Sequence, residues 1–139
     1  MHNKIKVIFD TNSQNEGFAR VTAAAFAAQL DPSLEELQDI KTAISEAVTN
    51  AIVHGYEEKE GKVCLEMEYT DRLLSFTIRD KGKGIPDIKK AMRPLYTSKP
   101  GAERSGMGFT VMESFMDSLS VSSHPGEGTR VVMTKRIHG

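Results

Sequence analysis

The spacing of hydrophobic side chains changes near Gly61, and this change constrains the fold more than any other feature of the chain. Upstream, hydrophobic residues recur with a helical period across residues 34–51. They are Leu37, Ile40, Ile44, Ala47, Val48 and Ala51. Downstream, residues 63–69 and 74–78 alternate hydrophobic and polar side chains, as half-buried strands do, and Asp71-Arg72 between them predicts a hairpin turn. A long amphipathic helix before a hairpin favours a helical layer packed on a sheet.

The N-terminal part adds a strand and a first helix. Residues 3–9 alternate, which predicts a half-buried strand. Ser13 and Glu16 have the spacing of a capping box, so a helix is expected from there to residue 30. An apolar stripe of helical period runs along it, made of Phe18, Val21, Ala25 and Ala28.

A second capping box, Ser33 with Glu36, starts the long helix, which Gly55 is expected to end. The later elements follow from glycines, prolines and short hydrophobic runs. They are a glycine-rich loop at 80–86, a short helix at 87–92, a loose segment at 94–108, a helix at 108–116, strands at 119–122 and 129–137, and a turn at 124–128. We therefore expect one α+β domain over residues 1–139, a two-layer sandwich with helices on one face of a mixed, mostly antiparallel sheet.

Size and charge exclude several classes of function. The 139 residues suit a single domain. Lys and Arg total 18 against 19 Asp and Glu, so the chain lacks the basic footprint of a nucleic-acid binder. The single cysteine, Cys64, excludes an internal disulfide and a thiolate metal site. Residues 1–10 lack the apolar core of a signal peptide, and residues 21–30 are too short to span a membrane, so we expect a soluble cytoplasmic protein.

Glu46 and Asn50 lie four residues apart in the segment SEAVTNAIVHGY, so they point the same way from the long helix. On a helical wheel, Glu46 lies roughly 150° from the middle of the hydrophobic side. Taken alone, the pair is most simply interpreted as part of a solvated helix face. His54, next to the glycine that ends the helix, is interpreted as structural, because a cation is favourable at a helix C-terminus. Met112 and Met116, one turn apart, are expected in the core.

Three glycine-containing segments follow. Asp80, Gly82 and Gly84 come directly after a strand, where an aspartate can accept a hydrogen bond from a base amino group and the glycines allow close approach of the backbone. Residues 104–109 enter a helix with small residues, whose exposed N–H groups suit phosphate oxygens. Residues 126–129 form the third segment. Taken singly, these are an ordinary turn with an aspartate at its start, a helix start after a loose loop, and a hairpin turn.

The order of these motifs carries more information than any one of them. A helix with Glu-x-x-x-Asn, a strand followed by Asp-x-Gly-x-Gly, a loose segment, Gly-x-Gly into a helix and Gly-x-Gly-Thr into a strand resemble the GHKL ATP-binding family of gyrase, heat-shock chaperone, histidine kinase and mismatch-repair ATPase domains. The likeness covers about residues 34–137. The segments SEAVTNAIVHGY, RDKGKGIPDI, PLYTSKP and ERSGMGFTVME are similar to the anti-sigma branch of small serine kinases, which implies a Bergerat-type ATP-binding fold.

The resemblance implies a role for each motif. Glu46 would act as the general base toward an attacking hydroxyl, and Asn50 would hold Mg²⁺, which prefers oxygen ligands. Asp80 would recognise the adenine amino group, with Thr129 assisting through water. Further implied contacts to ATP or ADP are Gly82, Gly84, Ile85, Thr97, Arg104, Ser105, Gly106, Met107, Gly108 and Phe109. Residues 87–108 would form a lid over the nucleotide, in which Lys99 has no assigned contact.

The resemblance also implies partners. One is an RNA polymerase sigma factor, expected to be a sporulation sigma factor, which the chain would hold inactive. The other is a STAS-domain anti-anti-sigma factor, which would be phosphorylated on serine. A homodimer is implied, and the first helix is the expected docking area, with Arg20 as the candidate contact.

Three other functions remain open from the sequence. The chain could be a non-catalytic module that uses ATP only to shape a sigma-binding surface, although such a module would not need Glu46 as a base. It could be a detached gyrase- or chaperone-type ATPase domain, although the short lid and lack of a transducer domain weigh against this. It could also be the related stress-response anti-sigma kinase.

Overall fold

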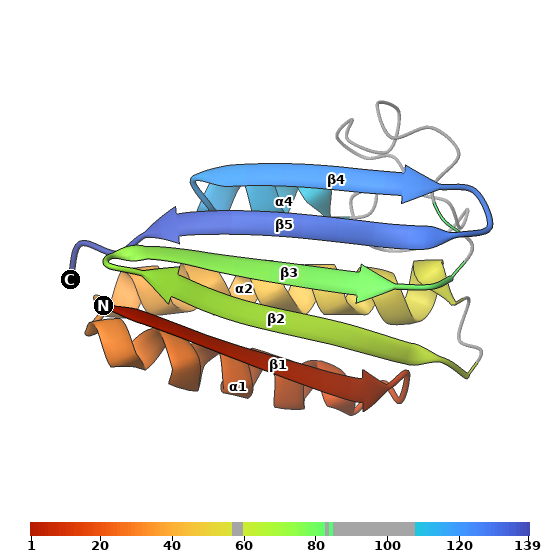
Figure 1. Ribbon diagram of the computed structural model, residues 1–139, viewed down its shortest axis with the longest axis horizontal. Coiled ribbons are helices and arrows are strands. Elements are labelled where there is room, and N and C mark those ends of the chain that lie inside the picture. Colours follow the sequence, from red (N-terminus) through yellow and green to blue (C-terminus); the bar gives the residue numbers. More distant parts are fainter. Residues whose placement is uncertain (57–59, 83, 85–107) are drawn as a thin grey trace.

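The computed structural model describes residues 1–56, 60–82, 84 and 108–139 as a five-stranded sheet with three α-helices (Figure 1). The elements in order are β1 (His2–Asp10), α1 (Asn15–Ala27), a 3-10 turn (Ala28–Leu30), α2 (Leu34–Thr49), a π-helix (Asn50–Gly55), β2 (Lys62–Thr70), β3 (Leu73–Asp80), α4 (Phe109–Phe115), β4 (Ser118–His124) and β5 (Gly128–Arg136). The expected helix at 87–92 and most of the loose segment at 94–108 lie outside the described residues.

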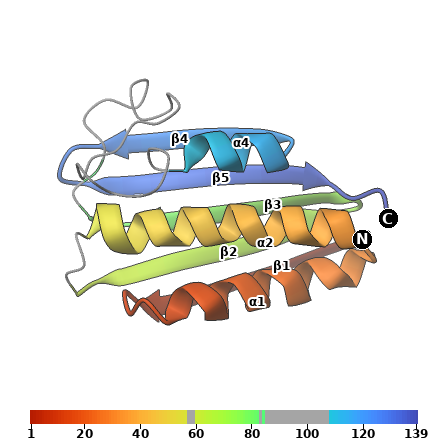
Figure 2. The same cartoon turned by 180° about the vertical axis from the view of Figure 1, so that it is seen from behind.

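The sheet has the strand order β1-β2-β3-β5-β4. Its helices all lie on one face, with α1 over the β1–β2 side, α2 over the middle and α4 over the β4–β5 side (Figure 2). The predicted two-layer α+β fold is therefore confirmed. The four strand pairings among the described residues are all antiparallel, so the expected mixed character of the sheet is not found in this part of the chain.

The core lies between the sheet and the helices. The inward side chains of β2 and β3 alternate with outward ones as predicted, and Leu65, Met67 and Phe76 are fully buried. Met112 and Met116 are buried as well, which confirms their predicted place in the core. Asp71 in the predicted hairpin turn has a positive φ of 54°, as tight turns often require.

The two capping-box predictions have different outcomes. Ser33 accepts a hydrogen bond from the backbone N–H of Glu36, and the Glu36 carboxylate accepts one from the N–H of Ser33, so the box that starts α2 is confirmed. At α1 the predicted box is wrong, because the helix begins after Gln14, which makes no side-chain cap. Only the backbone carbonyl of Ser13 takes part there, by accepting from the N–H of Glu16.

The apolar stripe predicted on α1 is not the side of the helix that packs. The buried residues are Ala19, Ala23, Phe26 and Ala27, and the Phe26 ring lies 5.3 Å from that of Tyr69 on β2. Phe18 and Val21 are instead 55% and 62% exposed. The helix is apolar on two sides, and the alanine side packs because small side chains allow the closest approach to α2 and the sheet.

Glu36 also joins the start of α2 to the last residues of the chain. Its carboxylate accepts hydrogen bonds from the backbone N–H groups of His138, at 2.7 Å, and Gly139, at 3.1 Å. Burial alone would raise the pKa of this carboxyl, but the hydrogen bonds from the backbone of His138, Ser33 and Gly139 outweigh it and lower the pKa from 4.5 to about 2.

Replacing Glu36 by Gln is therefore expected to lower the free energy of unfolding by about 1 kcal/mol near neutral pH, the usual effect of weakening a helix cap. Because the folded pKa lies below the unfolded one, the contribution of the charge is complete above pH 4.5 and is lost as the pH falls through about 2. Denaturant unfolding of both proteins from pH 2 to pH 7 measures this difference. Glu35→Gln, an exposed change in the same first turn, is the control, and an equal loss in both variants at all pH values would contradict the assignment.

Candidate functional site

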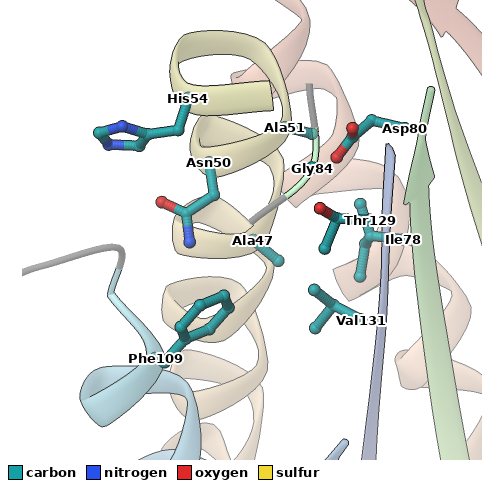
Figure 3. Close-up of a pocket in the computed structure, with 10 residues that line it drawn as sticks. All are labelled: Ala47, Asn50, Ala51, His54, Ile78, Asp80, Gly84, Phe109, Thr129 and Val131. Carbon is teal, nitrogen blue, oxygen red and sulfur yellow. The ribbon is translucent and has the colours of Figure 1, made fainter. Parts of the chain in front are cut away.

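A small pocket lies where β3 ends, β5 begins and the π-helix faces both strands (Figure 3). Its lining is Ala47, Asn50, Ala51, His54, Ile78, Asp80, Gly84, Phe109, Thr129 and Val131. Five of these are residues that the sequence analysis placed in a nucleotide site, and they come from four separate segments: Asn50, Asp80, Gly84, Phe109 and Thr129. Its volume is about 20 Å³, room for little more than a water molecule.

Asn50 and His54 come from the π-helix and point to the same side of it (Figure 3). They are only 6% and 4% exposed, so the interpretation of Asn50 as part of a solvated face is wrong. His54, which the sequence analysis interpreted as structural, is buried and also lines the pocket that contains Asp80. The available signal was its spacing, because His54 follows Asn50 by the same four residues that separate Asn50 from Glu46.

Asp80 supplies the buried carboxyl group of the pocket. It ends β3 directly opposite Thr129 of β5 and is 8% exposed. Burial raises the pKa of this carboxyl from 3.8 to about 6, although hydrogen bonds from the backbone N–H groups of Gly82 and Thr129 act in the opposite direction. Asp80 is therefore ionised at neutral pH in surroundings that disfavour the charge. A hydrogen-bond donor from a bound ligand would stabilise this carboxylate.

The backbone around Asp80 is held from two directions. Tyr56, just after the π-helix, donates from its hydroxyl to the Lys62 carbonyl and accepts from the N–H of Lys81 at 2.7 Å. Gly84 has a φ of +77°, and a Cβ there would overlap the His124 carbonyl in the β4–β5 turn. The helix end, the Asp80 loop and that turn are thus fixed relative to one another.

Glu46 lies beside the start of α4. Gly108, the N-cap of α4, has a φ of +74°, and a Cβ on it would overlap Glu46 Oε2 and lie 3.1 Å from Cδ. The carboxylate of α2 and the last glycine of the Gly-x-Gly segment are therefore in direct contact. Phe109, the next residue, is 2% exposed and lines the pocket beside Asn50.

Several residues predicted for the nucleotide site are not among the pocket residues described above. Ile85, Thr97, Arg104, Ser105, Gly106 and Met107, together with the unassigned Lys99, lie outside the described residues. Arg20 lies on α1, away from the pocket lining, in a separate groove described below. Gly82 is placed beside Asp80, to which its N–H donates at 2.9 Å.

The donors in the pocket fit Mg²⁺ held mainly by a nucleotide. In the part of the chain that the structure describes, no group of three or more His, Cys, Asp and Glu side chains could hold a metal. Asn50 offers one buried amide oxygen, and Mg²⁺ commonly takes one protein oxygen with phosphates and waters as its other ligands.

Among the described helices, none is both long and apolar enough to cross a membrane.

Comparison with known sequences independently supports the predicted ATP-binding family. The profile of the family described as "Histidine kinase-like ATPase domain" matches residues 10–135. The chain is 57% identical over 137 residues to the anti-sigma F factor of Clostridium acetobutylicum, covering 99% of this chain and 96% of that protein. It is 60% identical over 133 residues to the anti-sigma F factor of Clostridium kluyveri, covering 96% and 94%.

Solved structures agree on the fold. The RsbU and RsbW domains of Rv1364c from Mycobacterium tuberculosis match with a TM-score of 0.70 and 19% identity, over 97% of this chain and 32% of that one. The catalytic domain of the histidine kinase ThkA matches with a TM-score of 0.60 and 14% identity, over 96% of both chains. These likenesses support the fold, and the pocket lies in the part of it that the family profile covers.

Asp80→Asn is expected to change stability and nucleotide binding in opposite directions. The folded pKa lies above the unfolded one, so the protonated form stabilises the fold; this contribution is complete below pH 3.8 and is lost as the pH rises through about 6. The neutral amide should therefore raise the free energy of unfolding of the ligand-free protein by about 2 kcal/mol at pH 7.5 and hardly at all at pH 4. Affinity for ADP should fall about tenfold or more, because a charged acceptor is lost.

Denaturant unfolding at both pH values and calorimetric titration with ADP measure the two effects of Asp80→Asn. A variant that is less stable than the parent at pH 7.5, or one that binds ADP normally, would contradict this account of the carboxyl group.

Gly108→Ala tests the contact between α4 and Glu46. Alanine in the left-handed region costs about 1–2 kcal/mol, and the new methyl group also has to displace the Glu46 carboxylate. Gly126→Ala is a matched control, since Gly126 has a φ of +80° but nothing within 4 Å of the added Cβ. Thermal unfolding should show the larger loss for Gly108→Ala, and the crystal structure of that variant should show Glu46 in another rotamer. Equal losses and an unmoved Glu46 would mean that the contact is loose.

Proposed function

Since the chain belongs to the histidine kinase-like ATPase family and, within it, to the anti-sigma F factors, we propose that it is an ATP-dependent serine kinase that also inhibits a sigma factor. In this proposal it binds an RNA polymerase sigma factor, the sporulation factor sigma F, and holds it inactive. It transfers the γ-phosphoryl group of ATP to a serine of a STAS-domain anti-anti-sigma factor. Membership of the family implies binding of ATP or ADP, whereas the acceptor, the sigma factor and Mg²⁺ are part of the proposal.

The observation that carries the proposal is the position of Glu46 between two surfaces. On one side its carboxylate contacts Gly108 at the start of α4. On the other it lines a groove of about 470 Å³ between α1 and α2. The groove residues are Arg20, Val21, Gln38, Lys41, Thr42, Ser45 and Glu46. A serine that enters along the groove and a phosphoryl group held near Gly108 would therefore meet at Glu46.

The chemistry follows from these positions. In phosphoryl transfer the protein contributes mainly by orienting the reactants and stabilising charge. Glu46 would accept the proton of the serine hydroxyl as the oxygen attacks, the ordinary work of a general base. Asn50 would hold Mg²⁺ through its amide oxygen, and the ion would supply positive charge that offsets the charge of the phosphates.

The adenine base would bind where β3 ends and β5 begins. Asp80 would accept a hydrogen bond from the adenine amino group, while Thr129 would act through a water. Ile78 and Val131 offer an apolar surface from the sheet, and Ala47 faces them from α2 (Figure 3). A flat heteroaromatic ring bound between these side chains would remove apolar surface from water, as such pockets commonly do.

The exposed part of α1 that borders the groove between α1 and α2 supports a protein-binding role. Val21 is exposed beside Arg20 in the groove lining, and the Arg20 side chain is 43% exposed with its Nε 3.7 Å from Glu16 Oε2, while Phe18 is exposed further round the helix. Exposed aromatic and aliphatic side chains next to an arginine are typical of protein-binding surfaces. We therefore assign this face, with Arg20 as a contact, to the sigma factor. The proposal also includes a homodimer and a cytoplasmic location, on the ground of the sequence resemblance alone.

The deciding experiment mixes the protein with γ-labelled Mg·ATP and a purified STAS-domain protein. We expect label on a serine of the acceptor. Glu46→Gln should reduce transfer at least about a hundredfold, because general-base catalysis typically contributes that much, while ADP and sigma-factor binding stay within about twofold. Gln preserves the size of the side chain beside Gly108, and Glu35→Gln, on the exposed first turn of α2, is the control.

The alternatives give different results in the same experiment. Tight nucleotide and sigma-factor binding without transfer to any acceptor would identify a non-catalytic module. Release of labelled phosphate without acceptor labelling would identify an ATPase domain. Normal transfer by Glu46→Gln would remove Glu46 from the role of base.

A further inference from the structure

Lys135 is the only lysine or arginine that is buried among the residues described by the structure. It lies on the helix-facing side of β5 and is 9% exposed. Its Nζ donates a hydrogen bond to the carbonyl of Phe115, at 2.7 Å, and lies 3.5 Å from Asp39 Oδ2. Lysine is almost never buried without such partners, because removing its charge from water is costly. The contacts join three elements, β5, the last residue of α4 and the middle of α2.

These contacts form one of two points that fix α4 along α2. The first point is Glu46 against Gly108, and the second is Asp39 with Lys135 and Phe115. On α2 the two points are seven residues apart, from 39 to 46, and on α4 they are also seven apart, from 108 to 115. The helices run in opposite directions (Figure 2), so the two spacings of about 10 Å match.

The position of α4 depends on such contacts because the helix is short. It has only seven residues, well below the length at which a helix is stable on its own. Phe109 and Met112 bury its inner side but leave sliding along α2 weakly restrained, since apolar packing is not directional. A charged hydrogen bond to the last carbonyl of the helix does restrain sliding, and it is also favourable at a helix C-terminus.

We infer that Lys135 is a positioning residue, which holds α4 along α2 so that the Gly108 turn stays aligned with the Glu46 carboxylate. The inference rests on the proposed function, in which the phosphates lie at this turn. Lys135 itself lies six residues along β5 from Thr129, roughly 20 Å away, so it does not touch the nucleotide.

The inference predicts that replacing Lys135 affects binding of the phosphates of ATP and binding of its adenine differently. Asp80 and Thr129 lie on β3 and β5, whose pairing does not involve α4. A displaced α4 would therefore weaken binding of the phosphates more than binding of the adenine end, to which α4 contributes only Phe109. The ratio of the affinities for ATP and adenosine separates this role from general destabilisation, which would lower both affinities together.

The test replaces Lys135 by Met, which is of similar length and fills the buried position without charge. We expect the affinity for ATP relative to adenosine to fall about tenfold, the scale of one lost hydrogen bond to a charged phosphate. The amide protons of Met112 and Met116, which are bonded to the carbonyls of Gly108 and Met112 at 3.0 Å, should exchange faster with solvent. Amide protons of the β1–β2 pair should exchange at the parent rate.

Two further variants serve as controls. Lys4→Met removes another lysine–carboxylate pair from the sheet, 3.6 Å from Nζ to Glu66 Oε2, and should leave the affinity ratio and α4 exchange unchanged. Lys135→Arg keeps the charge and the N–H donors and should restore most of the ratio. Asp39→Asn should change both measurements in the same direction as Lys135→Met but by less, and it keeps the test available if the Met variant does not fold.

Equal loss of ATP and adenosine affinity, or no change in either, would overturn the inference. A parent protein that binds ATP but labels no acceptor would count against the proposed kinase activity only. In that case the affinity ratio and the α4 exchange rates still decide the role of Lys135.

Discussion

The packing of α2 across the sheet is the interaction on which the rest of the structure depends. Its inward residues include Ile40 and Ile44, which are fully buried, and two small residues, Ala47 and Ala51, which line the pocket at the strand ends. Each fully buried isoleucine contributes roughly 1.5–3 kcal/mol. Since the helix lies along the sheet over its whole length (Figure 2), the two alanines leave the space that Asn50, Asp80 and Thr129 surround. The same helix thus supplies the core and the pocket.

The change from α- to π-helix at Asn50 adapts that helix to a polar site. The N–H of Tyr56 bonds to the carbonyl of Ala51, five residues back, which is the π pattern. Such wide turns are less stable than α-helix and are found frequently at functional sites. Here the turn is held by the Tyr56 hydroxyl, which bonds to the backbone of Lys62 and Lys81 on β2 and after β3. The local cost is therefore offset by contacts that also hold the Asp80 loop.

Much of this architecture was predictable from the sequence because its signals are local. The capping box of Ser33 and Glu36 and the turn at Asp71 need only neighbouring residues, and both are confirmed. On α1 the period alone could not select the packed side, because an alanine-rich helix has apolar residues on both. Tertiary packing selected the small residues Ala19 and Ala23 and left Phe18 exposed.

The sequence also predicted some features of the candidate site and not others. The order of the motifs predicted that Asn50, Asp80, Gly84 and Thr129 would meet, and the structure brings them to one pocket. His54 was not predicted there, although it follows Asn50 by four residues, because its place next to the helix-ending Gly55 was sufficient to explain it. The Glu46–Gly108 contact joins residues 62 positions apart through a positive φ that no pattern of hydrophobic residues encodes. Tertiary contacts, more than local propensity, therefore determine how the Glu46 carboxylate and the Gly108 turn are aligned.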